Sequence, residues 1–178
     1  MEHKGLIIVH TGDGKGKTTA ALGMALRAWG NHLHVLILQF IKGSWRYGEL
    51  EAIKALSSSA GCIDIRQGGL GFSQRRDGMQ EDHRRAALAL LQTAMDELNS
   101  NAWDMIILDE FNYAYSFGFI CLDDLEKLLS ARPENVHLIF TGRNAAPELI
   151  ERADLVTEMR LVKHPFQRGI KAQKGVEF

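Results

Sequence analysis

Short apolar segments alternate along the chain with longer stretches of helical periodicity. The apolar segments have the length of β-strands and lie at residues 6–9, 35–40, 63–66, 105–108, 136–140 and 155–161. Several of them carry apolar residues at consecutive positions, which is typical of strands covered on both faces. Alternating strands and helices are the signature of βα units wound into a parallel sheet. We therefore predict an α/β fold of the P-loop NTPase type, a mostly parallel sheet of about six strands with helices on both faces.

Five segments between these strands are expected to be helical, namely residues 17–29, 49–56, 80–98, 122–131 and 147–153. The clearest is 80–98, where Leu88, Leu91 and Met95 recur at spacings of three and four residues. Residues 67–78 hold four glycines and show neither period, so we predict a loop. A loop of this length inside a compact domain is usually functional or disordered.

Length and composition bound the number of domains, the classes of partner and the cellular compartment. A chain of 178 residues is long enough for one domain, residues 1–178, but short for two. Lys and Arg number 21 against 22 Asp and Glu, which argues against nucleic acid or a membrane surface as a partner. The first apolar segment is too short for a signal peptide or a membrane span, so we expect a cytoplasmic protein. Cys62 and Cys121 lack metal-binding or disulfide spacing and are expected to be buried thiols.

The first predicted strand runs into HTGDGKGKTT, residues 10–19, and then into a predicted helix. Glycines let successive backbone N–H groups point at phosphate oxygens, and the helix N-terminus adds partial positive charge. The lysine before the helix can reach a phosphate, and the following threonine hydroxyl can bind Mg²⁺. We therefore expect ATP to contact this P-loop, through Gly12, Asp13, Gly14, Lys15, Gly16, Lys17, Thr18 and Thr19.

The loop is one residue shorter than the usual GxxxxGK[ST] pattern, because Gly12 and Gly16 enclose three residues. Either Thr11 stands where the first glycine normally does, or the loop holds the triphosphate in a geometry of its own. The alternative is a glycine-rich turn with two incidental lysines.

A second acidic motif supports the nucleotide hypothesis. Residues 105–110, MIILDE, form an apolar segment that ends in Asp109 and Glu110. Open α/β sheets bind ligands at the carboxyl ends of their strands, where such acids can hold Mg²⁺ or its waters. Thr18, Asp109 and Glu110 are therefore the candidate metal ligands. Alternatively, Asp109 or Asn112 caps a helix.

Other polar residues are expected at the same edge of the sheet. Gln39 and Lys42 follow the second predicted strand, and Thr141, Gly142 and Arg143 follow the fifth. Lys42, Arg143 and Arg27, the last on the helix after the P-loop, are candidate ATP ligands. Arg27 could instead pair with a carboxylate.

Beyond these local motifs, the chain resembles the P-loop type of corrinoid adenosyltransferase. The resemblance rests on TGDGKGKTTAALGMALRAWG, LQFIKG, LDEFNYA, TGRNAAPELIERADLVTEM and VKHPFQRGIKAQKGVEF, which recur in that family's order across nearly the whole chain. The short spacing between Gly12 and Gly16 is also that family's. The resemblance implies that cob(I)alamin attacks the ribose 5′ carbon of Mg-ATP and expels triphosphate, in adenosylcobalamin biosynthesis or salvage.

The resemblance also implies roles and partners. Lys17, Thr18 and Glu110 would be the catalytic residues, the protein a homodimer, and a reduced flavoprotein the electron donor. The family's GFTW-like loop appears here as residues 71–74, GFSQ, so Phe72 and Gln74 are the corrinoid-side candidates. Such aromatic residues displace the lower axial ligand of cobalt; alternatively, Phe72 anchors its loop on the core. Relatives often carry an N-terminal extension, so we expect a more open site here, or one covered by a partner subunit.

Two rival functions remain open at this point. One is a small-molecule kinase, although the short P-loop argues against it. The other is a regulatory ATP- or GTP-binding module, although no NKxD-type guanine reader follows the fifth predicted strand.

Overall fold

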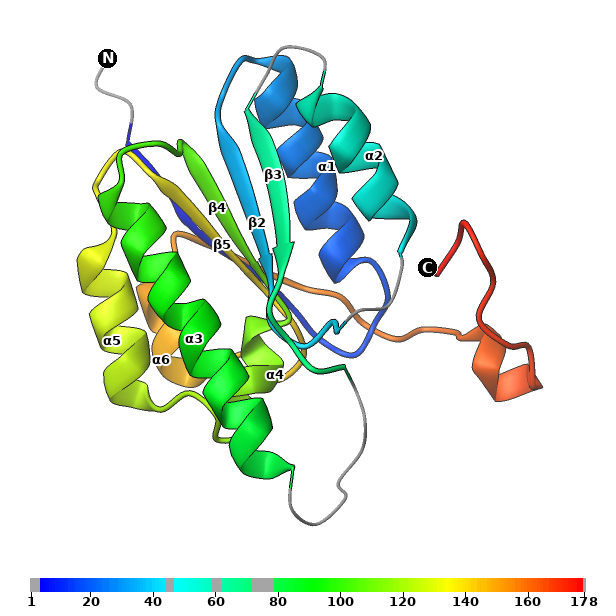
Figure 1. The fold of residues 1–178 in the computed structure, drawn as a ribbon. Helices are drawn as coiled ribbons and strands as arrows, with labels where there is room; N and C mark the ends of the chain where they lie inside the picture. The colour runs from blue at the N-terminus through cyan, green and yellow to red at the C-terminus, as the bar shows by residue number, and fades with distance from the viewer. Residues whose placement is uncertain (1–3, 44–46, 59–61, 72–78, 178) are drawn as a thin grey trace.

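The strands form one parallel sheet in the computed structural model, which describes residues 4–43, 47–58, 62–71 and 79–177 (Figure 1). Their order across the sheet is β3-β2-β4-β5-β1-β6, and all five pairings are parallel. The prediction of an α/β fold with a parallel sheet is confirmed. The strand bounds are β1 Ile7–Thr11, β2 Val35–Gln39, β3 Ile63–Gln67, β4 Met105–Asp109, β5 His137–Thr141 and β6 Leu155–Glu158.

Helices cover both faces of the sheet, as Figure 1 shows. α1 (Lys17–Gly30) and α2 (Gly48–Ser57) lie on one face. The opposite face carries α3 (Gln80–Asn99), α4 (Phe111–Ser116), α5 (Leu122–Ala131) and α6 (Pro147–Arg152). No helix among the described residues has both the length and the apolar character needed to cross a membrane.

The strands divide their side chains between two cores, because successive residues of a strand point to opposite faces. Ile37 and Ile107 pack on the side of α1, whereas Leu38 and Leu108 pack on the side of α3 and α5. Both sets are almost completely buried. This explains the consecutive apolar positions that predicted the strands.

Beyond shifts of one or two residues in the bounds of elements, the structure departs from the sequence prediction in three places. β6 ends at Glu158, three residues before the predicted end, and its four residues are exposed because it is an edge strand. α4 and a 3₁₀ helix at Pro165–Arg168 were not predicted. The expectation of buried thiols is wrong: Cys62 and Cys121 are exposed, and Cys121 is the N-cap residue of α5.

Polar residues form a row across the carboxyl ends of the strands. Gln39 of β2 is in register with Gln67 of β3 on one side and with Asp109 of β4 on the other. Thr141 of β5 is in register with His10 of β1. Strands that are apolar up to this point therefore end together in polar groups, and this edge holds the candidate site.

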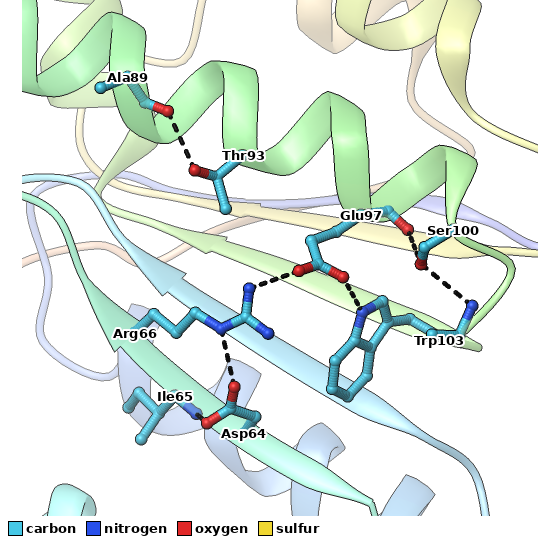
Figure 2. Close-up of polar contacts among 9 residues, drawn as sticks. Asp64, Ile65, Arg66, Ala89, Thr93, Glu97, Ser100 and Trp103 are labelled. Atoms are coloured by element: carbon cyan, nitrogen blue, oxygen red, sulfur yellow. Dashed lines mark hydrogen bonds and ion pairs between the residues drawn. The ribbon is translucent and has the colours of Figure 1, made fainter.

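A polar network on the α3 side joins the sheet to the end of α3 (Figure 2). The Glu97 carboxylate accepts hydrogen bonds from the Arg66 guanidinium and from the Trp103 indole N–H, the latter at 2.6 Å. Arg66 also donates to Asp64 at 2.8 Å. The bonds from Arg66 and Trp103 hold the pKa of Glu97 below its ordinary value.

We predict that Glu97→Ala lowers the free energy of unfolding by about 1–3 kcal/mol, because it leaves the donors of Trp103 and Arg66 unpaired. Urea denaturation at pH 7 measures this loss. The pKa of Glu97 is lower in the folded protein than in the unfolded chain. The stabilisation by Glu97 should therefore fade as the pH drops below about 4.5. Asp96→Ala, at an exposed neighbour on the same helix, should change stability by less than about 0.5 kcal/mol. Equal effects of the two substitutions would contradict the role of Glu97.

Candidate active site

The P-loop between β1 and α1 is packed against the chain that follows β6. Gly12 has a φ of +94°, and a Cβ there would lie 2.5 Å from the carbonyl oxygen of Met159. A Cβ on Gly14 would lie 2.7 Å from the same oxygen, to which the N–H of Gly14 donates at 2.6 Å. Both positions therefore require glycine, and the loop is a built element of the fold rather than an incidental turn.

Lys17 and Thr18 begin α1 and point in different directions. The Lys17 ammonium donates to the carbonyl oxygens of Gly12 and Gly14, each at 2.7 Å. An ammonium has three N–H donors, so one remains for a phosphate oxygen. Burial lowers the pKa of Lys17. The Thr18 hydroxyl donates to Asp109 at 2.7 Å, which leaves its oxygen lone pairs as acceptors or metal ligands.

Asp109 is a buried carboxylate whose two oxygens are fully used. Its Oδ1 accepts from the hydroxyls of Thr18 and Thr141, each at 2.7 Å. Its Oδ2 accepts from the Gln39 amide at 3.1 Å and lies 3.3 Å from the Lys42 ammonium. Asp109 is 1% exposed, and these four donors compensate the loss of water. The alternative that Asp109 or Asn112 caps a helix is wrong, because the N-cap residue of α4 is Glu110 and no side chain caps that end.

Glu110 adopts a left-handed backbone conformation, with a φ of +61°. The Thr141 hydroxyl accepts its N–H at 2.9 Å and so stabilises this turn. Among the described residues, the buried Oε2 of Glu110 has no hydrogen-bond partner. Burial, and then the charge of Asp109, raises the pKa of Glu110 to about 7. A strained residue with an unsatisfied buried oxygen is typical of a site where function and not stability sets the conformation.

These residues surround a cavity of about 570 Å³ in front of the P-loop. Seven of its lining residues come from the loop and the start of α1, and Glu110, Lys42 and Arg143 line it from other strand ends. Lys42 forms an ion pair with Glu49 at 2.8 Å, and Arg143 lies 3.6 Å from Asp13. Burial alone would lower the pKa of Lys42, but the charges of Asp109 and Glu49 raise it.

Not every predicted ligand reaches this cavity. Arg27 is exposed in the last turn of α1, about 15 Å along the helix axis from Lys17 at 1.5 Å per residue, so its predicted contact with ATP is not supported. Gly12 contributes its carbonyl to Lys17 and does not line the cavity. Phe72 and Gln74 lie outside the described residues.

The cavity also has lining residues that sequence reasoning missed. Tyr47 and Glu49 come from the start of α2, and Tyr113 comes from the short helix α4. Val176 and Glu177, near the chain end, line it as well, and Glu177 forms an ion pair with Lys15 at 3.0 Å. Tyr113, Val176 and Glu177 stand in segments that carry the family resemblance, but nothing in those segments singled them out as site residues. Tyr113 also follows Glu110 at a helical spacing that could have indicated it.

Comparison with known proteins assigns the family. The model for "ATP:corrinoid adenosyltransferase BtuR/CobO/CobP" matches residues 3–178. The chain belongs to this family. It is therefore a corrinoid adenosyltransferase, an enzyme that transfers the adenosyl group of ATP to a corrinoid, and the kinase and regulatory-module alternatives are set aside.

Curated relatives match the adenosyltransferase over nearly its full length. The corrinoid adenosyltransferase of Pseudomonas aeruginosa is 40% identical over 99% of this chain and 85% of its own. The corrinoid adenosyltransferase CobA of Salmonella typhimurium is 37% identical over 100% of this chain and 88% of its own.

Among solved structures, the flagellar accessory protein FlaH from Methanocaldococcus jannaschii has a TM-score of 0.59 at 15% identity, over 88% of this chain and 71% of that one. The RadB recombinase has a TM-score of 0.51 at 13% identity, over 88% and 74%. At this level of identity, the likeness shows a shared fold alone.

The adenosyltransferase site offers the oxygen ligands that Mg²⁺ prefers. Mg²⁺ is usually bound through one or two carboxylates, waters and substrate phosphates rather than by a cage of protein ligands. Within the described part of the chain, no group of three or more His, Cys, Asp or Glu residues could hold a metal ion. The Thr18 hydroxyl and the unsatisfied Oε2 of Glu110 fit this mode of binding.

We predict that Lys17→Ala lowers kcat roughly a hundredfold, because loss of one preorganised charge contact costs about 3 kcal/mol of transition-state stabilisation. The substitution should leave the fold intact, which circular dichroism can verify. Lys54→Ala, on the exposed side of α2, is the matched control and should turn over at the wild-type rate. Turnover of Lys17→Ala within twofold of wild type would contradict the P-loop assignment.

A second prediction concerns pH. Because the pKa of Glu110 is raised to about 7 in the folded protein, the unfolded chain releases this proton first as the pH rises from about 4.5. In protein without Mg²⁺, the free energy of unfolding therefore falls as the pH rises from about 4.5 to about 7. Glu110→Gln has no carboxyl group at this position, so it should not lose this stability. The Tm of the variant minus the Tm of the wild type should therefore be larger at pH 8 than at pH 5. A Tm difference independent of pH would contradict the assignment of the raised pKa.

Proposed function

We propose that the triphosphate of Mg-ATP binds on the P-loop while the ribose 5′ carbon faces a reduced corrinoid. The cobalt(I) centre attacks that carbon, a cobalt–carbon bond forms, and the bond from the carbon to the triphosphate oxygen breaks. The observation that carries this proposal is the cavity itself. Backbone amides, the Lys17 ammonium and the oxygens of Thr18 and Glu110 meet there at one edge of the sheet.

Catalysis in this scheme consists of positioning the substrates and stabilising charge on the departing triphosphate. Lys17 supplies one positive charge, and Arg143 and Lys42 line the same cavity. Thr18 and Glu110 would hold Mg²⁺, which would supply further positive charge when bound. The cobalt nucleophile carries no proton, so no residue needs to act as a general base. Glu110 therefore serves as a metal ligand, a role in which its carboxylate is ionised.

Asp109 acts on Thr18 rather than directly on the metal. Its carboxylate oxygens already accept four donors, about as many as an ionised carboxylate can take. Because the Thr18 hydroxyl donates its hydrogen to Asp109, its lone pairs are left for Mg²⁺. This ordering of roles refines the sequence prediction, in which Asp109 and Glu110 were equivalent metal candidates.

The corrinoid side and the assembly follow from the family resemblance. Phe72 removes the lower axial ligand of cobalt, and Gln74 stands where relatives carry tryptophan. The described segment that leads to Phe72 runs beside the site, since Gly71 donates to the carbonyl of Ile41 at 2.9 Å. A homodimer in the cytoplasm, supplied with electrons by a reduced flavoprotein, completes the proposal.

The proposal predicts triphosphate, and not ADP, as the phosphorus-containing product, because the whole polyphosphate leaves from carbon. Phosphorus NMR after a completed anaerobic reaction with ATP, Mg²⁺ and chemically reduced cobalamin measures this directly. The same mixture without cobalamin is the control and should retain ATP. Stoichiometric ADP would contradict attack at the 5′ carbon.

A further inference from the structure

A row of three hydrogen-bonded side chains crosses three adjacent strands at the edge of the site. The Gln67 amide of β3 donates to Oε1 of Gln39 on β2 at 3.0 Å, and Nε2 of Gln39 donates to Oδ2 of Asp109 on β4 at 3.1 Å. The three residues are paired in register, Gln39 with Gln67 and Gln39 with Asp109. Paired residues of neighbouring strands place their side chains on the same face, here the face that α1 covers.

The orientation of the central amide follows from the chemistry of its neighbours. An ionised carboxylate only accepts hydrogen bonds, so Gln39 must turn its nitrogen toward Asp109. Its oxygen then faces β3, where Gln67 supplies a donor. Gln39 is 0% exposed, so water cannot replace either partner. A fully buried amide with both ends assigned has one low-energy orientation.

The backbone holds Gln67 in place beside Gln39. The N–H of Gly68 donates to the Gln39 carbonyl at 3.1 Å. A Cβ on Gly69 would lie 2.4 Å from the carbonyl oxygen of Phe40, so this segment lies directly against the end of β2. The donor of Gln67 is thus fixed by side chain and backbone together.

We propose that Gln39 is a positioning residue for the metal site and that Gln67 holds its amide in the orientation that Asp109 requires. Gln39 binds one oxygen of Asp109 and so turns the other toward Thr18, whose hydroxyl then presents its lone pairs to Mg²⁺. Neither glutamine lines the cavity, so neither touches ATP directly. This inference rests on the proposed binding of Mg-ATP at Thr18.

The test measures how much Mg²⁺ tightens ATP binding, by calorimetric titration of ATP with and without Mg²⁺ in the absence of corrinoid. Substitution of a residue that supports a metal ligand typically costs 10- to 100-fold in metal affinity. We expect Gln39→Leu to reduce the tightening by Mg²⁺ roughly tenfold, with the metal-free Kd within twofold of wild type. Gln67→Glu should act in the same direction, because two carboxylates would then compete for the one amide nitrogen of Gln39. Gln67→Leu removes the donor without adding that competitor, so it should have the smaller effect.

Controls separate this proposal from the proposed function and from misfolding. Gln92→Leu, on the exposed face of α3, should leave both titrations unchanged. If buried Gln39→Leu fails to fold, the half-buried Gln67→Glu decides the matter. Wild-type tightening by Mg²⁺ in folded Gln39→Leu and Gln67→Glu would overturn the inference. An equal loss of ATP affinity with and without Mg²⁺ would also overturn the inference, because it would show that the two glutamines have a merely structural role. Failure of the wild-type protein to bind ATP more tightly with Mg²⁺ would instead contradict the proposed function.

Discussion

The active site of this adenosyltransferase depends on one buried negative charge. An ionised carboxylate withdrawn from water is costly unless donors surround it, and Asp109 has four of them within 3.3 Å. These donors come from the start of α1, from β2 and the residues after it, and from β5. Satisfying this one charge therefore fixes the start of α1, the end of β2 and the end of β5 relative to one another.

Thr141 extends that arrangement to Glu110. Its hydroxyl donates to Asp109 and accepts the N–H of Glu110, so one side chain orders both acids. Asp109 is thereby fully satisfied, while Glu110 keeps a buried oxygen without a partner among the described residues. Two neighbouring carboxylates thus have different surroundings: Asp109 is bonded to its neighbours, and Glu110 lines the cavity. FlaH and RadB share the fold at 15% and 13% identity, and a shared fold does not by itself set the chemistry of a site.

The sequence predicted most of the fold because the signals that set it are local. Short apolar segments identified all six strands, and the glycines and Lys17 identified the P-loop. α4 was missed because it has six residues, and its start depends on the left-handed turn at Glu110, which Thr141 stabilises from 31 positions away. Arg27 is close to the P-loop in sequence, but ten positions of α1 separate it from Lys17, and sequence proximity alone does not show this distance. The contacts of Lys42 and Gln39 with Asp109 depend on the register between β2 and β4, which one sequence does not encode locally.

The most direct test of this account is a crystal structure of the protein with ATP and Mg²⁺ bound. The account predicts the triphosphate on the amides of the P-loop and Mg²⁺ on the oxygens of Thr18 and Glu110. Asp109 should still accept the Thr18 hydroxyl and the Gln39 amide at the distances found here. A complex in which Asp109 binds Mg²⁺ directly and has released Thr18, or in which the triphosphate lies away from the loop, would contradict it.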